Sequence, residues 1–189
     1  MRRLVVFNNI TLDGFFTDAN GQIAWAHKGN DKEYNDFVAE NAKGGDTLIL
    51  GRKTYQELAS FWPTEQAKKT MPEAAEGMNR MRKLVFSKSL NDATWSNTTL
   101  LKGDIAEEVR RVKQEAGGDI AILGSGSIVS ALAQQGLIDE YQVVVNPVVI
   151  GKGRTMFDRI RSNMDLQLTK SRVFGNGKVY LCYEPTKGA

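Results

Sequence analysis

Glycines, hydroxyl groups and basic side chains follow three short apolar segments that are typical of buried strands. The segments at 47–50, 83–86 and 120–123 lead, respectively, into Gly51, Arg52, Lys53 and Thr54, into Ser87 and Lys88, and into Gly124, Ser125, Gly126 and Ser127. A glycine turn ahead of a helix exposes backbone N–H groups and the positive helix end, which suit a phosphate. Basic side chains bind a phosphomonoester. These residues predict a ligand with several phosphates, such as an adenine dinucleotide with a 2′-phosphate.

Each of these signals also has a purely structural explanation. A strand-to-helix turn with glycines is more often only a turn, and Arg52 and Lys53 alone are more often solvated surface charges. Ser87 alone could cap the end of its strand. The ligand hypothesis depends on the three strand ends lying together, because ligands of open α/β sheets bind beyond the carboxyl ends of the strands.

Two common nucleotide motifs are not matched. The stretch from Gly45 to Thr54 differs from a P-loop because Arg52 separates the second glycine from Lys53, and because an apolar strand lies between the glycines. The dinucleotide fingerprint is incomplete, since Val129 stands where its third glycine belongs. The sequence therefore indicates neither a P-loop ATPase nor an ordinary Rossmann dehydrogenase.

The composition argues against several other classes of protein. The 189 residues are 41% hydrophobic and 25% charged, as in ordinary globular proteins, and a net charge of +3 without a dense basic stripe gives no indication of nucleic-acid binding. No apolar stretch has the length of a membrane helix, and no signal peptide is recognised. With His27 and Cys182 as the only residues of their kinds, we expect a cytoplasmic protein without a metal site.

Strand and helix patterns alternate along the chain. The expected strands lie at 4–7, 47–50, 83–86, 120–123, 141–150, 166–174 and 178–184. Helical spacing of apolar residues occurs at 31–42, from 55 onward, at 65–82, 105–112 and 127–135. The last two strands flank a turn at 174–178. The predicted fold is α/β, with one domain over 1–185, a mostly parallel sheet flanked by helices, a C-terminal antiparallel hairpin and a short tail at 186–189.

Seven motifs along nearly the whole chain belong together. They are Leu12–Gly14, Leu50–Tyr55, Phe86–Lys88, Leu123–Gly126, Gly136–Glu140, Asn146–Val148 and Gly151–Arg154. With them the chain resembles the dihydrofolate-reductase-like superfamily, in particular the reductase domain of the bacterial riboflavin-pathway deaminase–reductase and its stand-alone relatives. The resemblance implies that fold, NADPH as cofactor, and hydride transfer to a C=N or C=O bond. The implied substrate is a small heterocycle or phosphoribosyl-pyrimidine-like compound, of riboflavin-pathway or pterin type.

The resemblance also implies roles for the three strand ends. The residues that would approach the 2′-phosphate and pyrophosphate of NADPH are Gly51, Arg52, Lys53 and Thr54. Ser87 and Lys88 would flank the adenosine. The residues that would cradle the pyrophosphate are Gly124, Ser125, Gly126, Ser127 and Ile128. Ser125 replaces a glycine of the riboflavin-type motif, so its backbone N–H is expected to be available provided that its φ is not positive.

On the substrate side, the resemblance places Asp13 and Gly14 near the nicotinamide and Trp25 over the substrate cleft. Reduction of C=N needs a proton donor or an ordered acid–water relay. Dihydrofolate reductase recognises its pterin with a carboxylate on the first helix, and Asp36 is the hypothesised counterpart. Its alternative is the usual one for a helix carboxylate, which is exposure to solvent.

The remaining candidates favour structural roles. Asp139 and Glu140 stand at a helix-to-strand junction, where carboxylates commonly bond loop amides, and His27 lies in a polar segment typical of a surface. Residues 1–189 contain neither a deaminase domain nor its His/Cys/Cys zinc set, so we expect a stand-alone reductase.

An apolar, β-rich edge is expected around Val143, Val145 and the residues after Ile150. Such edges are commonly covered by a second subunit, so the sequence predicts a homodimer. Because a fold does not fix a function, the alternative to a reductase is a non-catalytic homodimer of the same fold that binds a nucleotide or another ligand.

Overall fold

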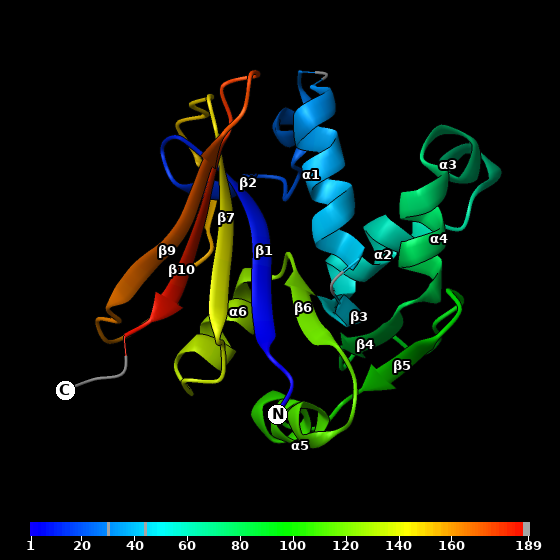
Figure 1. Ribbon diagram of the computed structural model, residues 1–189. Helices are drawn as coiled ribbons and strands as arrows, with labels where there is room; N and C mark the ends of the chain where they lie inside the picture. The colour runs from blue at the N-terminus through cyan, green and yellow to red at the C-terminus, as the bar shows by residue number, and fades with distance from the viewer. Residues whose placement is uncertain (30, 44, 187–189) are drawn as a thin grey trace.

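The computed structural model describes residues 1–29, 31–43 and 45–186, and its main element is an eight-stranded sheet (Figure 1). The order of the strands is β5-β4-β3-β6-β1-β7-β10-β9. The strands from β5 to β7 are parallel, and β10 runs antiparallel to both of its neighbours. Their bounds are β1 Leu4–Thr11, β3 Gly45–Gly51, β4 Arg82–Phe86, β5 Thr98–Leu101, β6 Asp119–Leu123, β7 Glu140–Asn146, β9 Leu166–Val173 and β10 Val179–Pro185. A second, two-stranded sheet pairs β2 Phe15–Asp18 with β8 Gly153–Thr155.

Helices cover both faces of the large sheet (Figure 1). Their bounds are η1 Ala24–His27, α1 Lys32–Lys43, α2 Arg52–Phe61, α3 Glu65–Thr70, α4 Pro72–Arg80, α5 Ile105–Gln114 and α6 Gly126–Ala133. The apolar residues of α5 and α6 pack on one face against Val6, Ile49 and Ile122. On the other face, α2 and α4 pack near Leu50, and α1 packs against β7 and β10. No helix in the described parts of the chain is both long and apolar enough to span a membrane.

The structure confirms the predicted fold class, including the C-terminal hairpin. The turn at 174–178 closes with a 2.9 Å bond from the Phe174 N–H to the Lys178 carbonyl. Two predicted elements differ. Residues 65–82 form two helices rather than one, because Pro72 begins α4 and lacks the N–H that would continue α3. The strand expected at 141–150 ends at Asn146, since Pro147 cannot donate to the next ladder bond.

Three short strands, β2, β5 and β8, were not predicted. Each has only three or four residues, too few for a periodic pattern to appear in the sequence. The first helix, expected at 31–42, is α1 and ends at Lys43, and β3 begins at Gly45. Residue 44 lies outside the described residues. Of the predicted tail, Thr186 is described and donates its N–H to the Asp165 carbonyl, whereas 187–189 lie outside the described residues.

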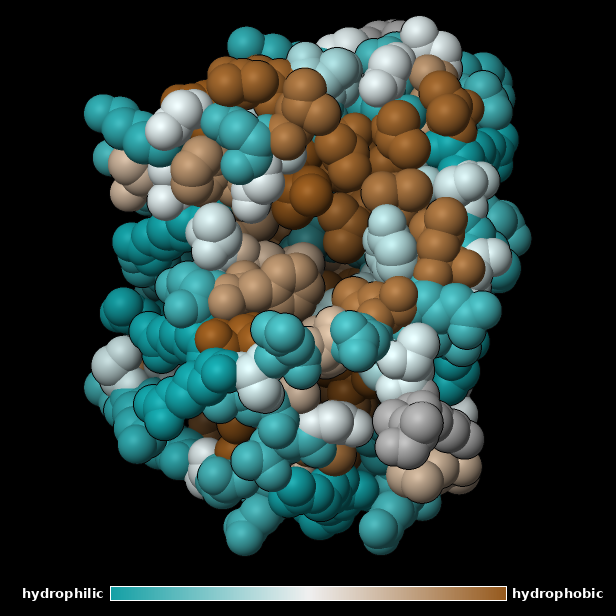
Figure 2. Space-filling view, turned by 90° about the vertical axis from the view of Figure 1, so that its left-hand side faces the viewer, coloured by the Kyte–Doolittle hydropathy of each residue, from teal (hydrophilic) through white to brown (hydrophobic). Residues whose placement is uncertain are grey.

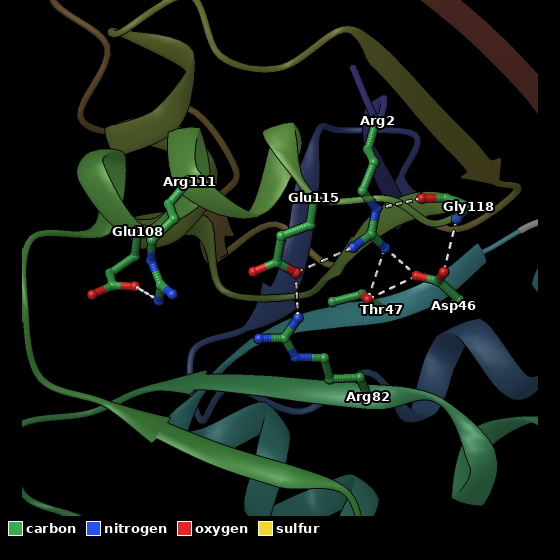
Figure 3. A network of polar contacts seen from close by, with 8 residues as sticks. All are labelled: Arg2, Asp46, Thr47, Arg82, Glu108, Arg111, Glu115 and Gly118. Carbon is green, nitrogen blue, oxygen red and sulfur yellow. Dashed lines mark hydrogen bonds and ion pairs between the residues drawn. The ribbon is translucent and has the colours of Figure 1, made fainter.

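A buried guanidinium ties together the amino ends of the parallel strands (Figure 3). Arg2 precedes β1, and its side chain donates to the Gly118 carbonyl at 2.7 Å, to the Thr47 hydroxyl at 2.8 Å and to Asp46. Arg82, at the start of β4, bonds Glu115 at 2.6 Å. These contacts connect the residue before β1, the first residues of β3 and β4, and the segment before β6, so the sheet is cross-linked at the end opposite its carboxyl edge.

Lys83 is fully buried in β4 without a carboxylate partner. Its ammonium donates to the carbonyls of Asn79 at 2.9 Å and Ser96 at 3.1 Å, and it lies 4.3 Å from the centre of the Trp95 ring. Burial lowers the pKa of Lys83 to about 8 from an ordinary 10.5. Between these values the unfolded chain binds more protons than the folded chain.

We therefore expect the free energy of unfolding to rise with pH from 8 toward about 10, by at most about 1.4 kcal/mol per pH unit from this one proton. Urea unfolding across this range measures the slope. Lys83→Met lacks the titrating group and should lose this contribution, whatever its absolute stability. Equal slopes in the two proteins would contradict the assignment.

Candidate functional site

The three predicted strand ends meet at one edge of the sheet. β4, β3 and β6 are neighbours and parallel, so Ser87, Gly51 and Gly124 follow at the same edge (Figure 1). A Cβ atom at Gly51 would lie 2.5 Å from Ser125 Oγ, and one at Gly124 would lie 2.7 Å from Thr54 Oγ1. The two turns therefore touch, and each glycine leaves room for a side-chain hydroxyl of the other turn.

Two helices begin at this contact, and neither starting residue caps its helix with a side chain. Gly51 precedes α2, and Ser125 precedes α6. Neither first turn contains an acidic residue, and the first turn of α2 instead carries the exposed Arg52 and Lys53. The first N–H groups of a helix have no acceptor within it. Together with the positive helix ends, these groups form an arrangement that binds an anion with several charges.

The turn before α6 differs from the prediction at Ser125. Its φ is +50°, beside Gly124 at +65°, because the chain needs two left-handed residues to pass from β6 into α6. The Ser125 N–H was expected to be available to a phosphate only if the φ of Ser125 were not positive, and this φ is positive. The Ile128 N–H is already bonded to the Ser125 carbonyl at 2.9 Å, and its side chain is in the core. The donors left for a phosphate are those of Gly126 and Ser127, the first two residues of α6.

Ser87 and Lys88 lie at the far end of this edge. The Ser87 hydroxyl oxygen accepts the N–H groups of Ser89 at 3.3 Å and Leu90 at 3.0 Å. Ser87 thus caps the end of its strand, which was the structural alternative, and its hydroxyl proton remains to be donated. The Lys88 side chain is exposed.

Asn8 links β1 to the turn at Gly124, a contact that was not predicted from the sequence. This buried residue of β1 accepts the Gly124 N–H at 2.8 Å and donates to the Met156 sulfur at 3.1 Å. A polar pair, Asn8 and Asn9, inside an otherwise apolar strand was the available signal. Asn8 holds the turn from the β1 side, where β6 and β1 are paired.

Both carboxylates expected on the substrate side, Asp13 and Asp36, are engaged in other contacts. The carboxylate of Asp13 accepts the N–H groups of Gly151 at 2.8 Å and Ile150 at 3.2 Å. A hydrogen bond from Thr11, followed by those backbone donors, holds the pKa of Asp13 below its ordinary value. Asp36 does not face the sheet. Its side chain is 63% exposed and bonds Lys32 at 2.6 Å on the outer face of α1, because the helical phase turns Tyr34 inward instead.

Buried polar residues gather on the α1 side of the carboxyl edge. The Tyr34 hydroxyl donates to Asn9 at 3.3 Å, and Asn146, at the end of β7, donates to the same oxygen at 3.0 Å. Lys178, from the C-terminal hairpin, donates at 2.6 Å to the carbonyl of Ala26 in η1. The predicted Trp25 lies in η1 next to this contact and is buried, with no partner for its indole N–H among the described residues. Gly14 follows the β1 turn and has a positive φ.

Asp139, Glu140 and His27 were expected to have structural rather than catalytic roles, and their contacts agree with this. Asp139 accepts the Leu4 N–H at 2.6 Å and pairs with Lys113 at 2.5 Å, and Glu140 pairs with Arg3 at 2.5 Å. His27 is exposed. Among the residues the structure describes, no three His, Cys, Asp or Glu side chains are grouped as metal ligands.

The sheet order defines a protein of the dihydrofolate-reductase-like fold. Residues 2–180 match the family model of the RibD C-terminal domain, and the chain belongs to this family. It is similar to the uncharacterized protein YyaP of Bacillus subtilis (strain 168), with 29% identity over 182 residues that cover 96% of this chain and 94% of the relative.

Solved structures agree on the fold. A protein from Shewanella sp. PV-4 assigned to riboflavin biosynthesis has a TM-score of 0.77 at 21% identity, with 98% of this chain and 99% of that one covered. The diaminohydroxyphosphoribosylaminopyrimidine deaminase/5-amino-6-(5-phosphoribosylamino)uracil reductase of Thermotoga maritima has a TM-score of 0.69 at 15% identity. The match covers 98% of this chain and 57% of the Thermotoga protein.

We expect Gly124→Ala to destabilise the protein more than Gly136→Ala. Both glycines have left-handed backbones, with φ of +65° and +61°, so both alanines carry similar strain. Only the Gly124 Cβ meets a neighbour, Thr54 Oγ1, whereas nothing lies within 4 Å at Gly136. Crowding should cost Gly124→Ala about 1–3 kcal/mol beyond the control.

Urea unfolding of the two variants measures the difference. Equal losses of stability in the two variants would contradict the close contact between Gly124 and Thr54.

Proposed function

We propose that this protein is an NADPH-dependent reductase that transfers hydride to a C=N or C=O bond of a small pyrimidine-like or pterin-like ring, in the cytoplasm. The observation that carries the proposal is the contact of two glycine turns, which places the first turns of α2 and α6 side by side at one sheet edge. Membership of the RibD C-terminal domain family supports a reductase of riboflavin-pathway type.

The donor set fits this cofactor. In the proposal, Gly126 and Ser127 donate backbone N–H groups to the pyrophosphate, and Arg52 and Lys53 bind the 2′-phosphate. Lys88 lies on the adenosine side. NADPH supplies the hydride, and the chain binds the cofactor and orients it toward the substrate.

One observation favours the alternative of a non-catalytic ligand-binding protein. The two carboxylates expected on the substrate side are a turn residue that accepts backbone N–H groups, Asp13, and a solvated helix residue, Asp36, so neither is free inside a site to act as an acid. For catalysis we propose that water delivers the proton. NADPH oxidation in the presence of pyrimidine, pterin and quinone-like acceptors distinguishes the two functions, because a binding protein would bind NADPH without oxidising it.

Replacing Arg52 and Lys53 together by Ala should weaken NADPH binding by about tenfold or more and change NADH binding little, because a 2′-phosphate contact is worth at least one charge-assisted hydrogen bond. Binding is measured by quenching of tryptophan fluorescence with each nucleotide.

The matched control is Lys68→Ala with Lys69→Ala, which removes two basic residues from the last turn of α3. Equal loss of NADPH and NADH affinity in the Arg52/Lys53 variant would refute the 2′-phosphate role. No binding of NADPH to the unsubstituted protein would refute the cofactor itself.

We also propose a homodimer through the outer face of β7, β10 and β9. The sequence placed the apolar edge at Val143 and Val145, but β7 is an interior strand, because β10 and then β9 are added beyond it, and Val143 is buried in the core. The apolar row that continues to the edge is Val145, Val179 and Val173, which stand opposite one another in β7, β10 and β9. Val173 is 71% exposed at the sheet edge. Figure 2 shows hydrophobic side chains gathered on the upper part of the side that carries β9 and β10. An apolar face of this kind is typical of an interface between subunits.

Val173→Lys should shift the protein from dimer to monomer in sedimentation velocity at micromolar concentration, because a buried ammonium would be left without a partner. Lys170→Ala is the control, since Lys170 pairs with Cys182 and lies on the opposite face of the same strand. A monomeric unsubstituted protein, or a Val173→Lys dimer of unchanged affinity, would contradict this interface.

A further inference from the structure

A cavity lies at the end of the large sheet where β1 and β7 begin, opposite the glycine turns. Its volume is about 580 Å³, within the range of about 300–1,000 Å³ that is typical of small-molecule sites. Its walls come from the end of α6, the start of β7, the end of β10 and residues 160–164. None of the residues 51–54, 87–88 or 124–127 lines it. The cavity is therefore separate from the proposed cofactor edge.

The inner wall of the cavity is apolar and aromatic. Five of its lining residues belong to the core on the α6 side of the sheet, namely Ala133, Ile138, Tyr141, Ile160 and Met164. Ile138 is 2% exposed and Tyr141 is 1% exposed, whereas Ile160 and Met164 are half-buried. This wall favours an apolar or aromatic body, because burying such a body removes apolar surface from water.

The Tyr141 hydroxyl in this wall is only weakly hydrogen-bonded. Its one partner among the described residues is the Met164 sulfur at 3.5 Å, and a thioether is a weak acceptor. Both side chains line the cavity, so the weak contact lies at its wall. Burial raises the pKa of Tyr141, so the hydroxyl keeps its proton at neutral pH. A hydroxyl group on a ligand matches it, because a hydroxyl both donates and accepts.

Two carboxylates of the lining are partly exposed, and each has one oxygen without a partner in the described part of the chain. Asp139 accepts the Leu4 N–H and the Lys113 ammonium through the same atom, Oδ2. Glu184 pairs with Arg3 through Oε1 at 3.1 Å. The side chains of Asp139 and Glu184 are 41% and 49% exposed. Oδ1 of Asp139 and Oε2 of Glu184 remain to accept from a cation.

The charge around the cavity is more negative than positive. Arg3 is the one cation among the described lining residues, and the buried Glu140 also binds it. Lys113, beside the cavity, pairs with Asp139, which leaves the group one carboxylate in excess. The last turn of α6 contains no basic residue, and the C-terminal end of a helix carries partial negative charge. The electrostatic preference is therefore for a cation.

The polar groups stand within the reach of one small molecule. Asp139 lies two residues before Tyr141, which is about 7 Å along the chain. Tyr183 of β10 pairs in register with Tyr141, and Glu184 follows it on a strand about 4.8 Å away. A ligand that spans from the buried hydroxyl to the exposed carboxylates is thus of the size that the cavity holds.

We propose that this cavity binds an aryl-alkyl amine whose ring carries a hydroxyl group. The ring packs on Ile138 and Ile160, and its hydroxyl replaces the Met164 sulfur as the partner of Tyr141. The ammonium lies at the rim, beside Asp139 and Glu184. This site does not depend on the proposed reductase function, because the cavity shares no residue with the cofactor edge.

The test uses three probes that differ by one group each. Tyramine has both the ammonium and the ring hydroxyl, phenethylamine lacks the hydroxyl, and 3-(4-hydroxyphenyl)propionate has a carboxylate in place of the ammonium. Each probe is titrated into the full chain labelled with nitrogen-15, and the amide NMR shifts give both the affinity and the site. Tyramine should bind about threefold or more tightly than either of the others, with shifts concentrated at 133–139 and 160–164.

Two conservative variants separate the two ends of the ligand. Glu184→Gln keeps the shape and removes the charge, so it should weaken tyramine by about threefold without weakening the propionate. Tyr141→Phe should abolish the advantage of tyramine over phenethylamine. Glu33→Gln is the matched control, because its carboxylate is similarly exposed, at 54%, pairs with Arg172, and does not line the cavity.

Equal affinity for tyramine and the propionate would overturn the site. Equal losses of tyramine affinity in Glu184→Gln and Glu33→Gln would also do so, as would shifts at residues 51–54 and 124–127 instead of the cavity, or no shifts at all. NADPH is absent from these titrations, so their outcome is independent of the cofactor assignment.

Discussion

Two backbone turns touch at the ends of β3 and β6, and the rest of the ligand edge depends on that contact. Gly51 and Gly124 face the side-chain hydroxyls of Ser125 and Thr54 so closely that a Cβ atom at either glycine would force the neighbour to move. Because adjacent parallel strands end at the same edge, the two helices that follow begin at the same place, and their first N–H groups have no acceptor within the helix. Asn8 secures the arrangement from β1.

The two ends of the large sheet differ in how their polar groups are hydrogen-bonded. At the amino end, the buried Arg2 side chain bonds groups from several segments and leaves its polar partners satisfied (Figure 3). At the carboxyl end, backbone donors and buried amide and indole groups are left open. Two buried lysines differ in the same way. Lys83, near the amino end of β4, donates to two carbonyl groups, whereas Lys178, in the C-terminal hairpin, donates to one.

Features that depend on a few consecutive residues were predicted from the sequence, whereas contacts between segments far apart in the chain were not. Long apolar strands and the polar residues directly after them were recognisable, because strand and turn chemistry lie within a few residues. Asn9, Tyr34, Asn146 and Lys178 are far apart in the chain, and only the sheet order brings them together. The orientation of Asp36 could not be predicted, because it depends on which face of α1 packs, and Tyr34 and Phe37 occupy that face. The left-handed Ser125 followed from the angle between β6 and α6, which no residue type reveals.

The strand order also means that the two parts of the large sheet are made at different times. The turns at Gly51 and Gly124 and strand β1 are present once residues 1–128 have been made, whereas β10 pairs with β7 only after nearly the whole chain exists. During synthesis on the ribosome, the glycine turns at the carboxyl edge can therefore form before the antiparallel part of the sheet. A chain broken off before the hairpin would keep these turns and lose Lys178, the residue that bonds η1 to the rest of the sheet.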